Sequence, residues 1–350
     1  MRTGKSLIEL ATELQRRATA KVDYLADTRE VGFVAATGKA ALVVNHQGYE
    51  TTAVANDQIA ERTGIPIKYF DRMLENAPAL LEANVRHWFA EQPERRMVRT
   101  LDGKARAFLS DRYRRIDNEE VAEAVLPILL DSGDDIRIES ADVTETRMYL
   151  KAVFPRLEGE VQPGDVVQSG VVISNSEIGL GAVSVQPLVF RLVCTNGMIA
   201  RDAGLNRYHV GRRNGVGNQV ELLLRDETKA ADDRAFLMAL QDVVKASLNR
   251  VQFDQLLHRL REATEGTRIQ QPPKAVETLG KAFSLSEGER TSVLENLIRG
   301  RDYSRWGLLN AVTAVAENTA SYDRATQLEE TGGKILDLNV TDWRRIAEAV

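Results

Sequence analysis

The residues best suited to chemistry in this sequence are arginines and aromatics gathered between Arg95 and Arg115. This stretch holds eight basic residues against two acidic ones, although the whole chain carries a formal net charge of -5. Guanidinium groups attract phosphates, and exposed aromatic rings offer faces on which bases stack. The segment therefore predicts contact with a single nucleic-acid strand. The predicted contact residues are Arg96, Arg99, Lys104, Arg106, Arg112, Tyr113 and Arg115.

A second basic segment lies between residues 199 and 217, where glycines and asparagines accompany the basic side chains. Backbone N–H groups in such a segment can approach phosphates. The contacts predicted here are Arg201, Arg207, Tyr208, Arg212 and Arg213. Both segments have a structural alternative, because surface arginines commonly pair with nearby carboxylates and a tyrosine can anchor the end of a strand.

The element that must position the first group is a β-hairpin from Arg96 to Ser110. Its turn is Asp102-Gly103, a strong signal for a tight reversal between alternating runs. A strand after this turn places Lys104, Arg106 and Phe108 on one face. We expect the hairpin to stand in solvent. Replacing Arg99, Arg106 and Arg112 together by Glu should then remove salt-sensitive oligonucleotide binding and leave folding intact.

The longest sheet-like stretch runs from Thr146 to Met198. Apolar residues alternate with polar ones from Met148 to Phe154, and runs rich in β-branched residues follow at 166–174 and 183–193. These runs predict three strands of an antiparallel meander. Cys194 is expected to be a small buried residue within the last strand, and Asn196-Gly197 to make a sharp reversal after it.

Helical patterns surround these strands and dominate the end of the chain, so the predicted fold class is α+β. We divide the chain into an N-terminal amphipathic helix (1–29), an α+β core with the basic hairpin and the meander (30–217), and a helical C-terminal region (218–350). Within the core, residues 55–74 have the spacing of a helix-turn-helix, a pattern that ordinary helix packing also produces.

Four pieces of the sequence resemble the uncharacterised phage- and plasmid-borne proteins grouped under domain of unknown function nine-three-two. They are Leu101–Asp117, Arg191–Met198, Arg305–Thr313 and Gly332-Gly333. The resemblance covers most of the chain from about Ala53 onward and implies a mobile genetic element in a bacterial host. It implies no activity, so it assigns no role to Arg191, Asn196 or Gly197.

Composition and motifs disfavour several other classes of protein. No phosphate-binding P-loop, dinucleotide fingerprint or nucleophile elbow is present, and the four histidines have no partner at metal-ligand spacing. A single cysteine excludes an internal disulfide, and no apolar run is long enough to span a membrane. We therefore expect no metal, no cofactor and no membrane contact, in a reducing cytoplasm. The sequence identifies no catalytic residue, and enzyme activity stays an open alternative.

The leading prediction is a phage or prophage DNA-metabolism protein that binds single-stranded DNA without ATP and anneals strands as a homo-oligomer. Arraying subunits would join local basic patches into a continuous groove despite the acidic pI of 5.6. One alternative is a duplex-DNA regulator that reads bases with Lys68, Tyr69 and Arg72. Another is a protein-interaction factor or virion component that makes no nucleic-acid contact and is built on the helical C-terminal half.

Overall fold

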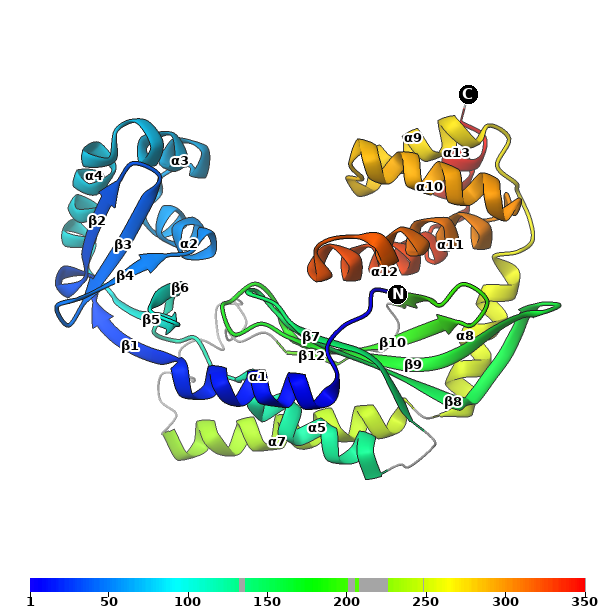
Figure 1. The fold of residues 1–350 in the computed structure, drawn as a ribbon, viewed down its shortest axis with the longest axis horizontal. Coiled ribbons are helices and arrows are strands. Elements are labelled where there is room, and N and C mark those ends of the chain that lie inside the picture. Colours follow the sequence, from blue (N-terminus) through cyan, green and yellow to red (C-terminus); the bar gives the residue numbers. More distant parts are fainter. Residues whose placement is uncertain (132–135, 201–204, 208–225, 248, 350) are drawn as a thin grey trace.

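The computed structural model describes residues 1–131, 136–200, 205–207, 226–247 and 249–349. Within these ranges the chain forms two six-stranded sheets, helices packed on both, and a helical C-terminal region (Figure 1). This confirms the predicted α+β class.

The first sheet and three helices form an N-terminal lobe, drawn at the left of Figure 1. The strand order is β1-β5-β6-β4-β3-β2, in which β4 and β6 run parallel and the other neighbours antiparallel. Its strands are β1 (Val22–Asp27), β2 (Gly32–Ala36), β3 (Lys39–Val44), β4 (Gln47–Thr51), β5 (Arg95–Leu101) and β6 (Lys104–Ser110). The short helix η1 (Thr28–Glu30) follows β1, and the three helices are α2 (Ala53–Thr63), α3 (Ile67–Asn76) and α4 (Pro78–Glu91).

The basic hairpin forms where the sequence predicts it. Asp102 and Gly103 have φ values of 50° and 74°, the left-handed pair that a type I′ turn between twisted strands requires. Behind the hairpin, Phe89 stacks on Phe108 with ring centres 5.3 Å apart. The hairpin is therefore part of the core of the lobe on one face.

The second sheet contains the predicted meander and is antiparallel throughout. Its order is β11-β10-β9-β8-β7, and β12 also pairs with β10. Its strands are β7 (Arg137–Val143), β8 (Met148–Gln162), β9 (Asp165–Asn175), β10 (Val183–Arg191), β11 (Asn196–Ile199) and β12 (Leu205–Arg207). The basic hairpin and the meander thus lie in different sheets.

Helices cover both faces of this second sheet (Figure 1). One face packs on α1 (Leu7–Ala20), α5 (Asn118–Asp131) and α7 (Asp226–Ala246). The other packs on α11 (Arg305–Val315) and α12 (Tyr322–Leu336). As a result, every residue of β8 from Met148 to Phe154 is buried, including those that alternation alone would place in solvent.

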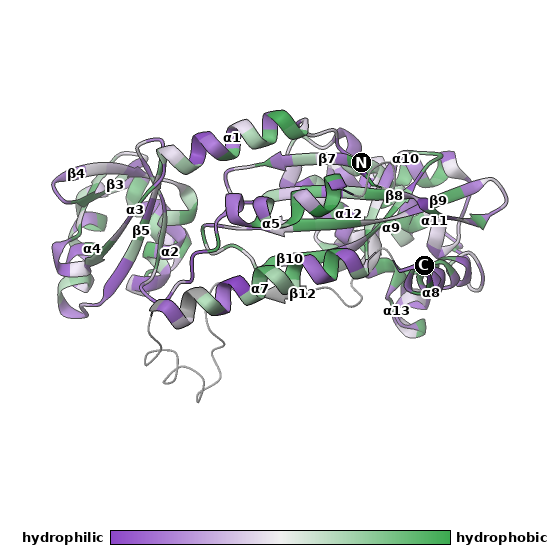
Figure 2. Ribbon diagram, turned by 90° about the horizontal axis from the view of Figure 1, so that it is seen from below, coloured by the Kyte–Doolittle hydropathy of each residue, from purple (hydrophilic) through white to green (hydrophobic). Residues whose placement is uncertain are grey.

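The remaining C-terminal helices pack on α11 and α12, on one another and on β8. They are α8 (Arg250–Glu262), α9 (Pro272–Phe283), α10 (Glu287–Gly300), η3 (Ala316–Asn318) and α13 (Val340–Ala347). Figure 2 views the molecule from the side of α1, α5 and α7, and shows hydrophilic and hydrophobic residues along α1. This helix begins at a capping box between Ser6 and Glu9 and buries Leu10 and Leu14. None of the helices in the described ranges has the length and apolar content that crossing a membrane requires.

Candidate functional site

Three of the sequence pieces that carry the resemblance meet at one end of the second sheet. Arg191–Met198 forms the end of β10, a turn and most of β11, while Arg305–Thr313 lies in α11 and Gly332-Gly333 in α12. Segments more than a hundred residues apart in the sequence therefore build one local structure.

Arg191 anchors this structure through an ion pair and a stacked ring. Its Nε and Nη2 donate to the two carboxylate oxygens of Asp165 at 2.6 and 2.9 Å. The indole Nε1 of Trp306 donates to the same carboxylate at 2.8 Å, and the guanidinium lies 5.7 Å from the centre of the Trp306 ring. Two-point pairing and stacking fix the plane of a guanidinium. The start of β9, the end of β10 and the first turn of α11 are thereby held together.

Asn196 connects β11 to α11 through buried polar groups. Its Nδ2 donates to Thr313 Oγ1 at 2.5 Å and to Asn310 Oδ1 at 3.2 Å. Asn310 in turn donates to the Trp306 carbonyl at 2.9 Å. The Oδ1 of Asn196 is buried and has no hydrogen-bond partner among the described residues. Leaving a buried acceptor unpaired lowers the free energy of unfolding.

The glycine pair allows α12 to approach β11 closely. A Cβ at Gly333 would lie 2.0 Å from the carbonyl oxygen of Ile199, and one at Gly332 would lie 2.5 Å from Cγ2 of Thr313. Real Cβ atoms do not approach that closely. These glycines are required by packing, since neither has a left-handed φ.

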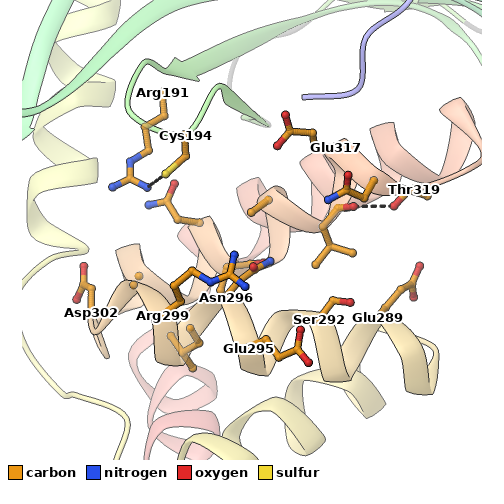
Figure 3. Close-up of a pocket in the computed structure, with 18 of the residues that line it drawn as sticks. Arg191, Cys194, Glu289, Ser292, Glu295, Asn296, Arg299, Asp302, Glu317 and Thr319 are labelled. Carbon is orange, nitrogen blue, oxygen red and sulfur yellow. Dashed lines mark hydrogen bonds between the residues drawn. The ribbon is translucent and has the colours of Figure 1, made fainter.

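Beside this junction lies a groove with a volume of about 780 Å³, between α10, α11 and the β10–β11 turn (Figure 3). A volume in this range suits a drug-sized ligand or a few residues of peptide. Its floor is formed by small residues of α11, namely Gly307, Ala311 and Ala314. Its polar lining is Arg191, Cys194, Glu289, Ser292, Glu295, Asn296, Arg299, Asp302, Asn310, Glu317, Asn318 and Thr319.

Acidic side chains outnumber basic ones in the groove. Glu289 is held by Arg324, whose Nε and Nη2 each donate at 2.7 Å, and this hydrogen bonding lowers the pKa of Glu289 to about 2. Glu295 and Glu317 are exposed and form no ion pair with any residue in the described ranges. The groove therefore presents exposed carboxylates from two of its walls, and the exposed Arg299 lines it as well.

The family described as "Domain of unknown function (DUF932)" matches residues 106–336, more than half of the chain. The chain belongs to the DUF932 family. The matched range starts later than the expected Ala53, so most of the N-terminal lobe lies outside it. The groove lies wholly inside it, because its lining runs from Arg191 to Thr319. Comparison with curated proteins and with solved structures gave no match.

Cys194 of this DUF932 protein is exposed, and its predicted burial in a strand is wrong. Strand β10 ends at Arg191, and residues 192–195 form the turn to β11. The left-handed residue of that turn is Thr195 with a φ of 48°, while Asn196 and Gly197 already belong to β11. Arg191 Nη1 donates to the Cys194 sulfur at 3.3 Å at the rim of the groove.

The central arginines of the basic hairpin are buried, which corrects the expectation that they stand in solvent. Arg99 is fully buried, with its guanidinium 3.0 Å from Asp23 and 2.7 Å from Asp117. Arg106 is also buried and pairs with Glu177 at 2.7 Å. Carboxylates from β1, the start of α5 and the loop after β9 surround the hairpin. These two arginines therefore join the N-terminal lobe to the second sheet and cannot reach a nucleic acid.

Two other residues predicted to contact nucleic acid also have partners within the fold. Tyr113 is buried, its hydroxyl donates to the Ser176 carbonyl at 3.0 Å, and burial raises its pKa. Arg96 pairs with Glu94 and lies over the ring of Phe108. The alternative of a buried strand-end anchor is the one observed for Tyr113.

Three residues of the first patch remain at the surface. Lys104 and Arg112 are exposed, and Arg115 keeps an exposed side chain although it lies 3.5 Å from Asp23. In the second patch, Arg201, Tyr208, Arg212 and Arg213 lie outside the described residues. The backbone of Arg207 lies in β12, and its side chain is not described.

The segment predicted as a helix-turn-helix forms two helices that meet at a corner, and each helix carries an acidic side chain there. Gly64, with a φ of 68°, ends α2, and α3 begins at Ile67 and exposes Lys68, Tyr69 and Arg72. Burial raises the pKa of Asp57 on α2, and the negative charge of Asp71 on α3 raises it further.

No three His, Cys, Asp or Glu side chains of the described ranges lie together as a metal site would require. The lining of the groove on α10 was not singled out by the sequence. Exposed Glu, Asn and Ser on one face of a helix are ordinary surface residues until a second element faces them.

Proposed function

We propose that this DUF932 protein is a protein-interaction factor whose groove takes a short basic segment of a partner polypeptide in the bacterial cytoplasm. The observation that carries the proposal is the pair of exposed carboxylates, Glu295 on α10 and Glu317 on η3, on either side of a floor of small residues. A Lys or Arg side chain lying across this floor would meet negative charge from both sides.

The floor itself favours a polypeptide main chain. Gly307, Ala311 and Ala314 lie on one face of α11, since they are four and three residues apart. None of these three residues has a side chain longer than a methyl group, so a bound backbone can approach the helix at these positions. Such an approach places its amide groups within reach of the lining amides.

Asparagines around the floor offer groups that can pair with peptide amides. Asn296 donates its Nδ2 to the Ala311 carbonyl at 3.2 Å, which leaves its Oδ1 free to accept. Asn318 is exposed at the end of the groove near Glu317. Amide-to-amide pairing gives a binding site its orientation, and the carboxylates give it charge selectivity.

Titration of the full-length protein with a short arginine-containing peptide, followed by isothermal calorimetry, tests the proposal. We expect saturable binding that weakens with salt, and no binding of a peptide of equal length with Glu in place of Arg. The double variant Glu295→Lys, Glu317→Lys should reduce affinity at least about tenfold, since two attractive contacts become repulsive.

A protein with a net charge of -5 attracts polycations in general, so a matched control is needed. Glu227→Lys on α7 is exposed and changes the net charge in the same direction away from the groove. Two such changes outside the groove should leave peptide affinity nearly unchanged. Equal loss in the control and the groove variant would show bulk attraction and contradict the proposal.

A second candidate is binding of single-stranded DNA by a homo-oligomer, now resting on Lys104, Arg112 and Arg115. The supporting observation is that these three side chains stay exposed at the surface of the lobe. A competition between single- and double-stranded oligonucleotides across salt concentrations tests this candidate. Lys104→Glu with Arg112→Glu should abolish the shift, and an unchanged shift would remove these residues from the site.

A further inference from the structure

A second cavity, of about 710 Å³, lies at the outer edge of the N-terminal lobe. It is bounded by η1, the first residues of β2, the β3–β4 turn and α4. Its lining consists of Thr28, Arg29, Glu30, Val31, Gly32, Val43, Asn45, His46, Arg86, Phe89 and Ala90. This edge cavity lies outside the range matched by the DUF932 family and apart from both functions proposed above.

Basic side chains dominate the charge of the edge cavity. Arg29, His46 and Arg86 line it, against Glu30 alone on the acidic side. Arg29 pairs with Asp27 at 2.8 Å and Arg86 with Glu82 at 2.9 Å, and each arginine side chain is 63% exposed. Arg86 is held through one nitrogen, so its guanidinium can turn to an incoming anion at small cost. Arg29 pairs with both oxygens of Asp27 through Nε and Nη2, and its Nη1 is the group that an anion would meet.

Part of the edge cavity is apolar. Half-buried Val43 and exposed Ala90 line it, and Phe89 and Val31 lie beneath them in the core of the lobe, 2% and 4% exposed. Gly32 adds no side chain on β2, which is an edge strand of the first sheet. A flat ring or a short hydrocarbon can therefore lie against this apolar part while its charged group faces the arginines.

His46 occupies a position that the backbone itself does not favour. Asn45 and His46 form the tight β3–β4 turn with φ values of 50° and 65°. A type I′ turn prefers Gly at its second position, because a side chain there is strained. Strained non-glycine residues cluster at functional sites, although His tolerates this backbone region better than most residues do. The side chain at this strained position is the imidazole of His46, which lines the edge cavity.

We propose that the edge cavity binds a phosphate-bearing ligand with an aromatic or aliphatic body. Arg29 and Arg86 pair with the phosphate, and His46 contributes a further hydrogen bond to it. The body of the ligand lies on Val43 and Ala90. The arginines and the imidazole come from three separate elements, so folding of the lobe is what brings them together.

Phenyl phosphate, added to the full-length protein and followed by calorimetry and by NMR shifts of labelled arginine side chains, is the direct probe. We expect phenyl phosphate to bind at least about tenfold more tightly than inorganic phosphate, because only the former uses the apolar part of the cavity. A 5′-mononucleotide competing at the same site would support the proposal with a nucleotide as the ligand. Failure of phenyl phosphate to bind at millimolar concentration would overturn it.

Two variants test the residues. Arg29→Gln with Arg86→Gln should weaken phenyl phosphate binding at least about tenfold, whereas Arg72→Gln on α3 of the same lobe should not. His46→Gly places the residue that the turn prefers, so we expect an equal or higher Tm together with weaker binding. If all variants bind phenyl phosphate as the unchanged protein does, the ligand lies elsewhere and the proposal is wrong.

Discussion

The ammonium of Lys151 on β8 lies 2.5 Å from Oε2 of Glu329 on α12, and neither side chain is exposed. The same ammonium donates to Thr326 at 3.1 Å and lies 4.7 Å from the centre of the Tyr322 ring. The other oxygen of Glu329 is buried with no hydrogen-bond partner among the described residues. A charged pair is therefore buried within the contact between the second sheet and α12.

Removing one member of this pair should destabilise the fold strongly. Lys151→Met leaves the buried Glu329 carboxylate without its hydrogen-bonded ammonium, and we expect a loss of about 3–5 kcal/mol in the free energy of unfolding. The double variant Lys151→Met, Glu329→Leu should recover most of that loss, because it leaves no buried charge. Urea denaturation of the unchanged protein, the single variant and the double variant measures both changes in the free energy of unfolding. Equal losses in the single and double variants would contradict this account.

A methyl group at Gly333 should separate α12 from β11. A Cβ there would meet the Ile199 carbonyl at 2.0 Å, so Gly333→Ala should cost about 1–3 kcal/mol of stability through forced backbone shifts. Gly288→Ala is the matched control, because it is also helical and a Cβ there meets nothing within 4 Å. We expect that control to be neutral or stabilising by up to about 1 kcal/mol. Similar Tm values for the two variants would argue against a close helix–strand contact.

The ion pair at the rim of the groove should make part of the stability depend on acid pH. Hydrogen bonds from Arg324 lower the pKa of Glu289 from 4.5 to about 2. A lowered carboxyl pKa means that its stabilising contribution is complete above the ordinary pKa and is lost as pH falls toward the folded value. Glu289→Gln should therefore flatten the decrease of Tm between about pH 5 and pH 2. Parallel Tm profiles of the two proteins across that range would refute the assignment.

The sequence predicted local structure well where a few adjacent residues decide it. Asp102-Gly103 specifies the hairpin turn through its own backbone preferences, and the β-branched runs specify the meander. The burial of Arg99 could not be predicted in the same way. Its carboxylate partners, Asp23 and Asp117, lie 76 and 18 residues away along the chain, and only the tertiary fold brings them together.

The same limit applies to the groove. The pieces Arg191–Met198 and Arg305–Thr313 were recognised in the sequence as segments without a role, and the fold brings them into contact. The role of Glu295 in the groove could not be predicted from the sequence, because Glu295 is a single exposed residue on an amphipathic helix. Its significance depends on Glu317 lining the same groove from another element.

Substitutions along the basic hairpin should separate buried from surface cations. Arg99→Ala removes a fully buried guanidinium and leaves Asp23 and Asp117 without their shared partner, so we expect a loss of about 3–5 kcal/mol. Lys104→Ala on the same hairpin is exposed and should change stability by no more than about 0.5 kcal/mol.

The combined replacement of Arg99, Arg106 and Arg112 by Glu, suggested by the sequence as a binding test, should instead prevent folding. It would bury two new carboxylates beside Asp23, Asp117 and Glu177. Circular dichroism and thermal denaturation show whether the triple variant folds. A cooperative transition at the unchanged Tm in the triple variant would mean that Arg99 and Arg106 are at the surface in solution, and the nucleic-acid site on the hairpin would regain its support.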